Sequence, residues 1–460
     1  MKKWIVLALA MILVLPSMSY AGTATSRWDL AIGGYVKFDI MWADQAVQPE
    51  MGQAHRESDT LKSSIDKYNA LTWASGETAI NFLVKGPDTW GAKTMAFVEG
   101  SFRRQAKVNF GSSTTGADSY GANTSSYGDF GMTRAFMKFD WPTVSLLIGT
   151  NYTLPGNMPC FCLMTTNQIG ADRMGYMLPQ ISLTWQATKD FSISGGVIAP
   201  YDPVKGMAGT PAPGIAMDDF SRSQWPVFFT DFVYKSDAMG RIGPWMLQFG
   251  VGGMYGKETP LDPGSSGASV TRWVSGSPGT VTYYKSDFDT SDVDMWLATF
   301  KVYVPIIPEK APGSTQGSLG LAMTGYTGQN LRTLFAAAPP LMFSSQSYDR
   351  NTVTANADFV APVMTGGWGT LQYYWTNTVW SGFYYGQARV SLSQARKATT
   401  PTGGIERIQN YIVNLVYDPN PAIRLGIEYS YITTHYAASI PGLKSEGNNN
   451  SVHFAAQYFF

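Results

Sequence analysis

Apolar and polar residues alternate one by one along stretches of about ten residues, and this pattern constrains the fold most strongly. The stretches 411–417 and 181–186 show it clearly. Near the C-terminus one face would carry only large apolar side chains, those of Ile423, Leu425, Ile427, Tyr429 and Tyr431. Because side chains alternate between the two faces of a β-strand, the pattern indicates strands with one apolar and one polar face. A soluble β-sandwich and a membrane β-barrel both use such strands.

The segment ends and the connectors favour the barrel. Aromatic residues bracket the alternating stretches, as at 373–375 and around Trp225, and aromatic girdles mark the two interfaces of outer-membrane barrels. The connectors also alternate in length, as expected for short periplasmic turns and long extracellular loops. The short ones carry turn-forming residues at 140–143, 187–190 and 418–421. The long ones are 103–130, 151–176, 200–225, 257–291 and 432–450.

A count of the alternating stretches predicts sixteen strands. They are expected at 30–42, 76–86, 92–103, 131–140, 143–151, 177–187, 190–200, 226–236, 244–256, 292–304, 317–327, 353–362, 368–378, 407–417, 422–432 and 451–460. An even number puts both termini on the periplasmic side, as in bacterial single-chain barrels. The predicted fold class is therefore all-β: a transmembrane antiparallel up-and-down β-barrel of about sixteen strands. A barrel this wide leaves a water-filled channel, because its own side chains cannot fill it.

The N-terminus has the features of a secretory signal peptide. Lys2 and Lys3 precede an apolar run at 4–15, and a small-residue ending at Ala21 follows. We expect residues 1–21 to be removed and 22–460 to form one barrel domain in the outer membrane of a Gram-negative bacterium. A retained anchor is the weaker alternative, since the apolar run is too short to span a bilayer.

Composition excludes several classes of function. The formal net charge is zero and charged residues make up 14% of the chain, so the cation excess that nucleic-acid binders use is absent. The mean hydropathy of −0.10 is too low for a helical membrane protein. No zinc, haem or nucleotide motif occurs, and the three histidines His55, His435 and His453 have no partner motif, so we expect neither a cofactor nor catalysis.

Several stretches resemble Gram-negative trimeric outer-membrane porins, most closely the DcaP-like dicarboxylate porins. They are 33–39, 96–102, 133–136, 147–149 and 424–429, with the final strand ending at Phe460. The resemblance implies a homotrimer of sixteen-stranded barrels whose third extracellular loop folds inward, which makes 151–176 the candidate constriction loop. It also implies that Phe460 is a signal for the barrel-assembly machinery, and that the barrel is surrounded by outer-membrane lipid and lipopolysaccharide.

The strand phase assigns a set of charged residues to the channel wall, because a cation facing lipid at the bilayer midplane costs about 2–4 kcal/mol. The cations are Lys37, Lys93, Arg103, Arg134, Lys138, Lys301 and Arg424, and the anions are Asp39, Glu99, Asp231 and Glu428. One hypothesis is a mild preference for anions, carboxylates included, with Arg103, Arg134 and Lys138 as a basic wall. The alternative is that these charges pair off, Arg424 with Glu428 among them, and only keep the channel wet.

The candidate constriction loop offers two further predictions. Asp172 and Arg173 are its only charged residues, and opposed charges at a constriction would set up a transverse field; an ordinary surface loop is the alternative. Cys160 and Cys162 could form a disulfide in the oxidising exported location, or stay as thiols. We rank a metal site below both.

The sequence thus predicts a porin that conducts small hydrophilic solutes and ions by passive diffusion. One alternative is a barrel that sheathes a multihaem cytochrome, and another is a secreted β-sandwich adhesin. A porin would conduct ions when purified alone, whereas an adhesin would be soluble without detergent.

Overall fold

The computed structural model describes most of the chain from residue 28 onward. The described residues are 28–45, 54, 57, 69–75, 77–102, 131–153, 155, 156, 158–163, 177–199, 225–258, 268–274, 277–283, 293–331, 342–345, 357–360, 363–391, 405–436 and 442–460. The expected signal peptide, 1–21, lies outside them. Within these ranges, no helix is long and apolar enough to cross a membrane.

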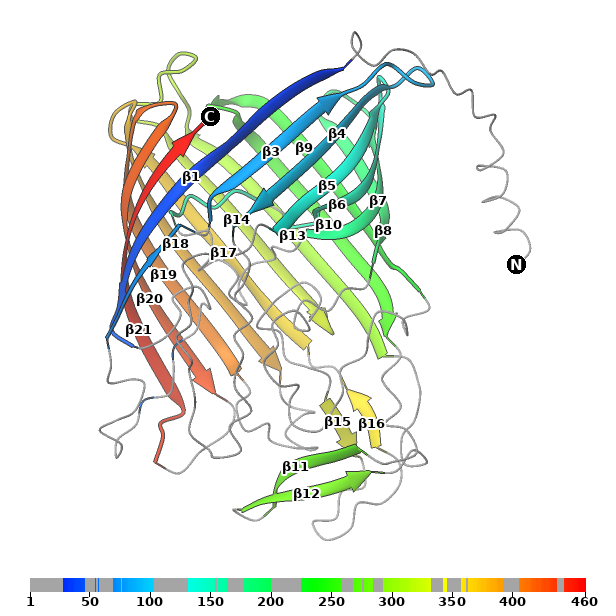
Figure 1. Ribbon diagram of the computed structural model, residues 1–460, viewed down its shortest axis with the longest axis vertical. Coiled ribbons are helices and arrows are strands. Elements are labelled where there is room, and N and C mark those ends of the chain that lie inside the picture. Colours follow the sequence, from blue (N-terminus) through cyan, green and yellow to red (C-terminus); the bar gives the residue numbers. More distant parts are fainter. Residues whose placement is uncertain are drawn as a thin grey trace, which may run out of the picture.

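One antiparallel sheet closes on itself as a sixteen-stranded barrel (Figure 1). Two short strands, β2 (Ala70–Ala74) and β3 (Ala79–Lys85), together count as one barrel strand, because both pair with β1 (Asp29–Ala43), one after the other along its length. The other strands are β4 (Lys93–Ser101), β5 (Gly131–Asp140), β6 (Val144–Tyr152), β7 (Met177–Gln186), β8 (Phe191–Ile198), β9 (Val227–Ile242), β10 (Trp245–Glu258), β13 (Val293–Ile307), β14 (Leu319–Gln329), β17 (Val363–Tyr374), β18 (Val379–Ser391), β19 (Ile405–Asn420), β20 (Ile423–Tyr436) and β21 (Glu446–Phe459).

The first and last strands close the barrel. β1 pairs with β21 from Tyr35 opposite Phe459 to Ala43 opposite Ser451, and the backbones of Gly34 and Phe460 exchange two hydrogen bonds of 3.0 and 3.1 Å. Closure leaves no sheet edge to be covered. The predicted up-and-down barrel is confirmed. The β-sandwich hypothesis is wrong, because the strands form one closed sheet rather than two stacked ones.

The expected strand at 353–362 is wrong. Of that stretch, β16 (Ala357–Val360) pairs with β15 (Met342–Ser345) in a separate two-stranded sheet. The strand that sequence analysis missed is β18, which pairs with β17 on one side and β19 on the other. The two errors compensate, so the predicted number of strands is correct although one strand was misplaced.

The two ends of the barrel differ in their connectors. The short turns predicted at 140–143 and 187–190 are confirmed, at 141–143 and 187–190. The one predicted at 418–421 lies later, at 421–422, because β19 continues to Asn420. The hairpin of β11 (Ala268–Val274) and β12 (Ser277–Tyr283) lies beyond the opposite end, together with the β15–β16 hairpin (Figure 1). We call the two ends the short-turn end and the long-loop end.

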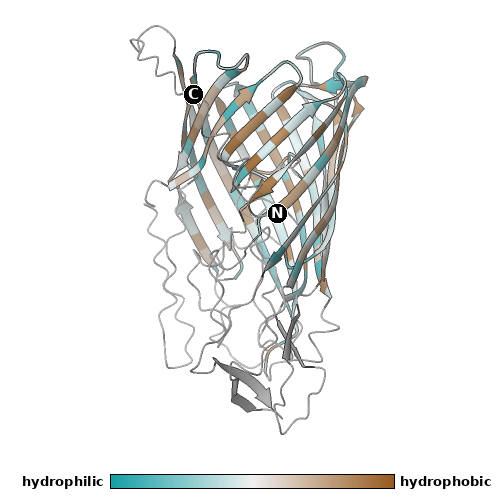
Figure 2. Ribbon diagram, turned by 90° about the vertical axis from the view of Figure 1, so that its right-hand side faces the viewer, coloured by the Kyte–Doolittle hydropathy of each residue, from teal (hydrophilic) through white to brown (hydrophobic). Residues whose placement is uncertain are grey.

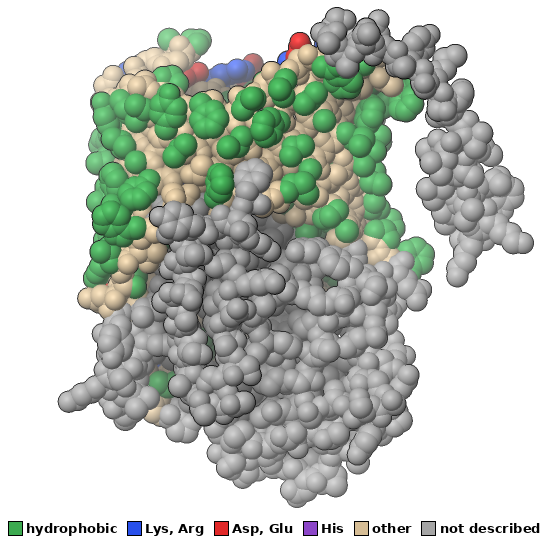
Figure 3. Space-filling model, viewed as in Figure 1, with side chains coloured by type: hydrophobic (Ala, Val, Ile, Leu, Met, Phe, Trp, Pro, Cys, Tyr) green, Lys and Arg blue, Asp and Glu red, His purple; other side chains and the backbone are tan. Residues whose placement is uncertain are grey.

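The outer surface of the barrel is apolar. Large side chains project from the predicted face, with Ile427 51% exposed, Ile181 50% and Leu415 49%. Figure 3 shows such side chains as a belt over the described part of the wall, with charged groups at the short-turn rim. Colouring by hydropathy shows the alternation along the strands (Figure 2). An apolar band around a closed barrel is the surface that outer-membrane proteins present to lipid.

Candidate pore

The inner wall carries the residues that alternate with the apolar belt. On β19 and β20 these include Asn410, Asn414, Glu428 and Ser430, all at most 5% exposed. Their outward neighbours, such as Val413 and Ile427, are about half exposed. The polar face of the alternation therefore encloses the interior, as the sequence predicted.

A segment of the candidate constriction loop runs inside the barrel. We call residues 153–163, as far as they are described, the lumen segment. Thr324 on β14 donates a hydrogen bond of 3.1 Å to the carbonyl of Gly156, and Asn414 on β19 donates one of 2.8 Å to the carbonyl of Phe161. The segment thus crosses the inner wall from β14 to β19, tied by its own backbone.

The far end of the lumen segment is held by charged groups. Glu428 on β20 accepts a hydrogen bond of 2.7 Å from the backbone nitrogen of Leu163 and one of 3.1 Å from Asn414. Lys37 on β1 donates to the carbonyl of Leu163 at 3.1 Å. The backbone N–H and the carbonyl of buried Leu163 are therefore each bound by a charged side chain. Hydrogen bonds to charged groups are about twice as strong as those between neutral groups.

The wall beneath the lumen segment is apolar rather than polar. Met158 is buried against Tyr303, Trp368, Tyr384 and Ile412, which lie on β13, β17, β18 and β19. The ring of Phe161 also meets Tyr303 edge-on at 6.4 Å. Since the lumen segment covers these side chains, this part of the inner wall does not need to face water.

Two inner-wall glycines make room for the segment. A Cβ atom at Gly426 would lie 2.5 Å from the side chain of Leu163, and one at Gly382 would overlap the carbonyl oxygen of Phe161. Real Cβ atoms essentially never approach so closely, so a larger residue at Gly382 must displace the backbone of the segment and one at Gly426 must displace the side chain of Leu163. The glycines act through close approach, and they help to fix the depth at which the segment lies.

The predicted wall residues Lys37 and Asp39 belong to a buried ionic cluster. Lys37 forms an ion pair with Glu77 and lies 3.3 Å from Asp39. A nitrogen of His453 lies 2.6 Å from Asp39. All four side chains are nearly inaccessible to solvent, and Lys37 is 1% exposed. The cluster therefore fastens the lumen segment and presents little charge to the channel.

The proposed basic wall is largely neutralised. Arg134 makes two hydrogen bonds to Glu99, at 2.6 and 2.9 Å, and Lys138 lies 2.7 Å from Asp140. Arg103 lies outside the described residues. Each described cation of the proposed wall thus has a carboxylate partner on its own or the next strand.

The predicted pair of Arg424 and Glu428 is wrong. Arg424 binds both oxygens of Asp418, at 2.8 and 2.9 Å, in the turn-side part of β19. Glu428 lies four residues farther along β20 and binds Leu163 and Asn414 instead. The pairing of β19 with β20 places Arg424 opposite the end of β19, close to Asp418. Glu428, four residues farther along β20, is too distant to reach it.

The remaining described wall charges lie on β4, β9 and β13. Lys301 forms an ion pair of 2.7 Å with Asp231, and both are buried. Lys93 begins β4 at the short-turn end, is exposed, and faces Asp140 in the register. Asp172 and Arg173, the predicted constriction charges, lie outside the described residues.

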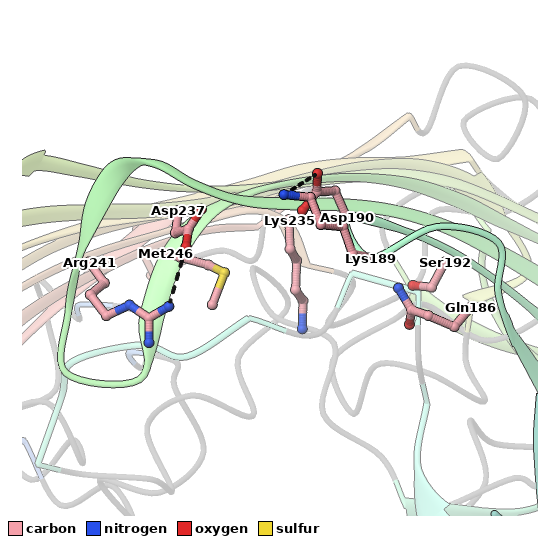
Figure 4. A pocket seen from close by; sticks show the side chains of 8 residues that line it. All are labelled: Gln186, Lys189, Asp190, Ser192, Lys235, Asp237, Arg241 and Met246. Atoms are coloured by element: carbon pink, nitrogen blue, oxygen red, sulfur yellow. Dashed lines mark ion pairs between the residues drawn. The ribbon is translucent and has the colours of Figure 1, made fainter. Parts of the chain in front are cut away.

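A hollow at the short-turn end contains a cation that sequence analysis did not assign. It has a volume of about 380 Å³ and is lined by residues of β7 to β10 and their turns. Lys189 pairs with Asp190 at 4.0 Å and Arg241 with Asp237 at 3.9 Å, whereas Lys235 points into the hollow (Figure 4). Within the described ranges no carboxylate lies at ion-pair distance from Lys235.

Cys160 and Cys162 lie on the lumen segment with their sulfur atoms 3.0 Å apart. The structure has them as thiols, and both pack against the apolar cluster around Met158 and Tyr303. The disulfide stays a prediction.

Sequence analysis missed Glu77, Asp418, Asn414 and Lys235 as members of the site. Asp418 was assigned to a turn and Glu77 to the start of a strand, so neither was tested as a partner. Lys235 could have been found, because it shares the inward phase of Asp231 on β9. Within the described part of the chain, no three His, Cys, Asp or Glu residues form a group that could hold a metal ion.

Comparisons with known proteins show the fold. No protein family and no curated protein matches the sequence. Among solved structures, the outer membrane channel DcaP of Acinetobacter baumannii has a TM-score of 0.64 at 13% identity, covering 95% of this chain and 99% of that one. An anion-selective porin from Comamonas acidovorans has a TM-score of 0.51 at 9% identity, covering 94% and 100%. The predicted resemblance to such porins is confirmed at the level of the fold, which is that of barrels in the Gram-negative outer membrane.

Proposed function

We propose that this protein is an outer-membrane porin that lets small hydrophilic solutes and ions diffuse passively. The observation that carries the proposal is the closed barrel itself, with an apolar belt outside and polar groups inside. Sixteen strands enclose more space than their side chains fill, so water occupies the remainder. The protein performs no chemistry in this function and needs no cofactor. It keeps a hydrated path open.

The loop 151–176 is the constriction of this channel. The lumen segment supports this role, because its backbone is bonded to β14, β19, β20 and β1 on the inner wall. A chain fixed inside a barrel narrows it at that level. Asp172 and Arg173 would supply the transverse field.

Selectivity for anions is mild. Most described wall charges cancel in pairs, which supports the alternative in which they only keep the channel wet. Lys235 is the exception: it lies on the inner face of β9 in the phase of Asp231, whose carboxylate is paired with Lys301. A structurally similar porin is named as anion-selective. Lys235 and Lys93 are therefore the residues that would attract anions, carboxylates included.

The remaining assignments follow from the barrel. Residues 1–21 direct export and are removed, 22–460 form the barrel, and Phe460 is the signal for the assembly machinery. The mature protein is a homotrimer in lipid and lipopolysaccharide. No observation favours the cytochrome sheath.

Planar bilayer recordings of the purified protein test the proposal. We expect ohmic steps in multiples of three, and a reversal potential under a KCl gradient that shows chloride to be somewhat more permeant. Absence of conductance from a correctly folded barrel would refute the porin function. A clear cation preference would refute only the anion selectivity.

A further inference from the structure

Two phenylalanine rings lie side by side on the inner wall of the barrel, where a merely hydrated path needs no aromatic surface. Phe97 on β4 pairs in register with Phe136 on β5, and their rings are stacked with the centroids 5.4 Å apart. The next residues, Val98 and Met137, are 45% and 48% exposed on the outer face, so the two rings point into the barrel. We propose that Phe97 and Phe136 form a binding site for a sugar on the wall of the channel.

The surface around the two rings is flat and apolar. The guanidinium carbon of Arg134 lies 4.6 Å from the centroid of the Phe97 ring, so this planar group extends the row of rings. On β3, Leu83 pairs with Phe97 from the other side. Leu83 and both rings are partly exposed, whereas the apolar cluster around Met158 is buried beneath the lumen segment. The rings are therefore accessible to a solute inside the barrel.

An ion pair lies at each end of the rings. Glu99 and Arg134 lie two residues beyond the rings toward the long-loop end, and Lys138 with Asp140 lies beyond them toward the short-turn end. The side chains of Arg134 and Lys138 are 24% and 31% exposed, so both can contact a solute. The strand rises about 14 Å between these two cations. Because cations only donate and carboxylates only accept hydrogen bonds, each pair offers both kinds of partner.

This combination of groups selects a neutral solute with an apolar face. The charges cancel within each pair, so this wall gives little net attraction to a free ion. A solute without polar groups would remove water from both pairs, which costs free energy. A sugar ring avoids both problems. Its C–H groups can pack on the electron-rich faces of the aromatic rings, and its hydroxyl groups can donate to the carboxylates and accept from the cations.

The rings also lie next to the constriction. Tyr152, the last residue before the lumen segment, has its ring centroid 5.3 Å from the guanidinium carbon of Arg134. The hydrogen bonds described for the lumen segment go to β14, β19, β20 and β1. A sugar on β4 and β5 would thus be held at the start of the constriction loop. The inference rests on the proposed porin function, which brings solutes to this wall, and it names one class of solute.

Ligand-observed NMR tests the site without any current. The probe is maltose, and the purified protein is kept in a detergent that has no sugar head group. Saturation of the aromatic protons of the folded protein should pass to the C–H protons of maltose. Mannitol, a linear polyol with hydroxyl groups but no ring face, should receive far less saturation.

Variants identify the side chains that hold the sugar. The double variant Phe97→Leu, Phe136→Leu keeps an apolar wall but loses both flat faces, and it should bind maltose on the order of tenfold more weakly. The double variant Phe97→Tyr, Phe136→Tyr keeps both rings and should bind as the wild type does. Phe82→Leu makes the same change on the outer face of β3, where Phe82 is 39% exposed, and should also bind as the wild type does.

Three results would overturn the proposal. The first is the absence of saturation transfer to maltose in the folded wild type. The second is undiminished maltose binding by a folded double leucine variant. The third is tighter binding of benzoate than of maltose, because charge would then decide the ligand. A protein that binds maltose but does not conduct would refute the porin function alone, and one that conducts without binding maltose would refute the sugar site alone.

Discussion

The anchoring of the lumen segment at Glu428 can be tested by removing one charge. Glu428→Gln keeps the size of the side chain and an oxygen acceptor. In the wild type, the carboxylate of Glu428 accepts two hydrogen bonds, from Leu163 at 2.7 Å and from Asn414 at 3.1 Å. A bond to a charged group contributes about 1.5–3 kcal/mol and a neutral one about 0.5–1.5 kcal/mol. The substitution therefore costs on the order of 1–3 kcal/mol at this end of the segment.

This free energy sets the expected size of the effect. Since about 1.4 kcal/mol corresponds to tenfold in an equilibrium constant, the population with Leu163 detached rises on the order of 5- to 150-fold. Detachment changes the free cross-section of the channel. Single-channel recordings should show this as more frequent brief excursions from the main conductance level.

The control has the same charge change elsewhere. Glu309→Gln lies in the turn between β13 and β14, away from the lumen segment. It should leave the frequency of excursions from the main conductance level unchanged. If Glu428→Gln folds normally and its open-channel noise equals that of the wild type, Glu428 does not hold the segment and the reasoning fails.

Three further substitutions test other parts of the structure. Lys235→Glu should move the reversal potential under a KCl gradient toward cation preference, and by more than Lys310→Glu, an exposed turn residue; equal shifts would contradict the role given to the short-turn hollow. Val413→Arg places a cation on the lipid face and should lower the free energy of unfolding in lipid vesicles by about 2–4 kcal/mol, whereas Val413→Leu should be nearly neutral. Lys37→Met leaves Glu77 and Asp39 buried without their cation, a loss of about 3–5 kcal/mol that should lower the melting temperature in detergent, and an unchanged melting temperature would argue against a buried ionic cluster.

The barrel was predictable where one face meets lipid and the other meets polar groups. On β19 and β20, Leu415 and Ile427 point outward while Asn414 and Glu428 point inward, so the period of two is visible in the sequence. On β18 this contrast disappears. Phe383 and Tyr385 face outward, but Trp380 and Tyr384 face inward under the lumen segment. A strand that is apolar on both faces has no polar alternation to detect.

The ion pairs were less predictable than the strand phase. The phase of a residue depends on its own strand, whereas its partner depends on the register between strands. Arg424 was matched with Glu428 by their spacing along β20, but the β19–β20 turn brings Asp418 to it. The role of Glu428 depends on a segment more than 260 residues earlier in the chain, and a pattern within one strand carries no information about that contact.

The central claim is that the apolar face of the alternation meets lipid while the polar face encloses water, and two adjacent residues of β9 test it directly. Tyr234 projects from the outer face, 42% exposed, and Lys235 from the inner face. Spin labels at Tyr234→Cys and Lys235→Cys, in a background with Cys160→Ser and Cys162→Ser, can be compared in bilayers for collision with oxygen and with a water-soluble nickel chelate. The structure predicts that the label at 234 is relaxed by oxygen and the label at 235 by the nickel chelate. Equal access of the nickel chelate to both labels, or the reverse order, would contradict it.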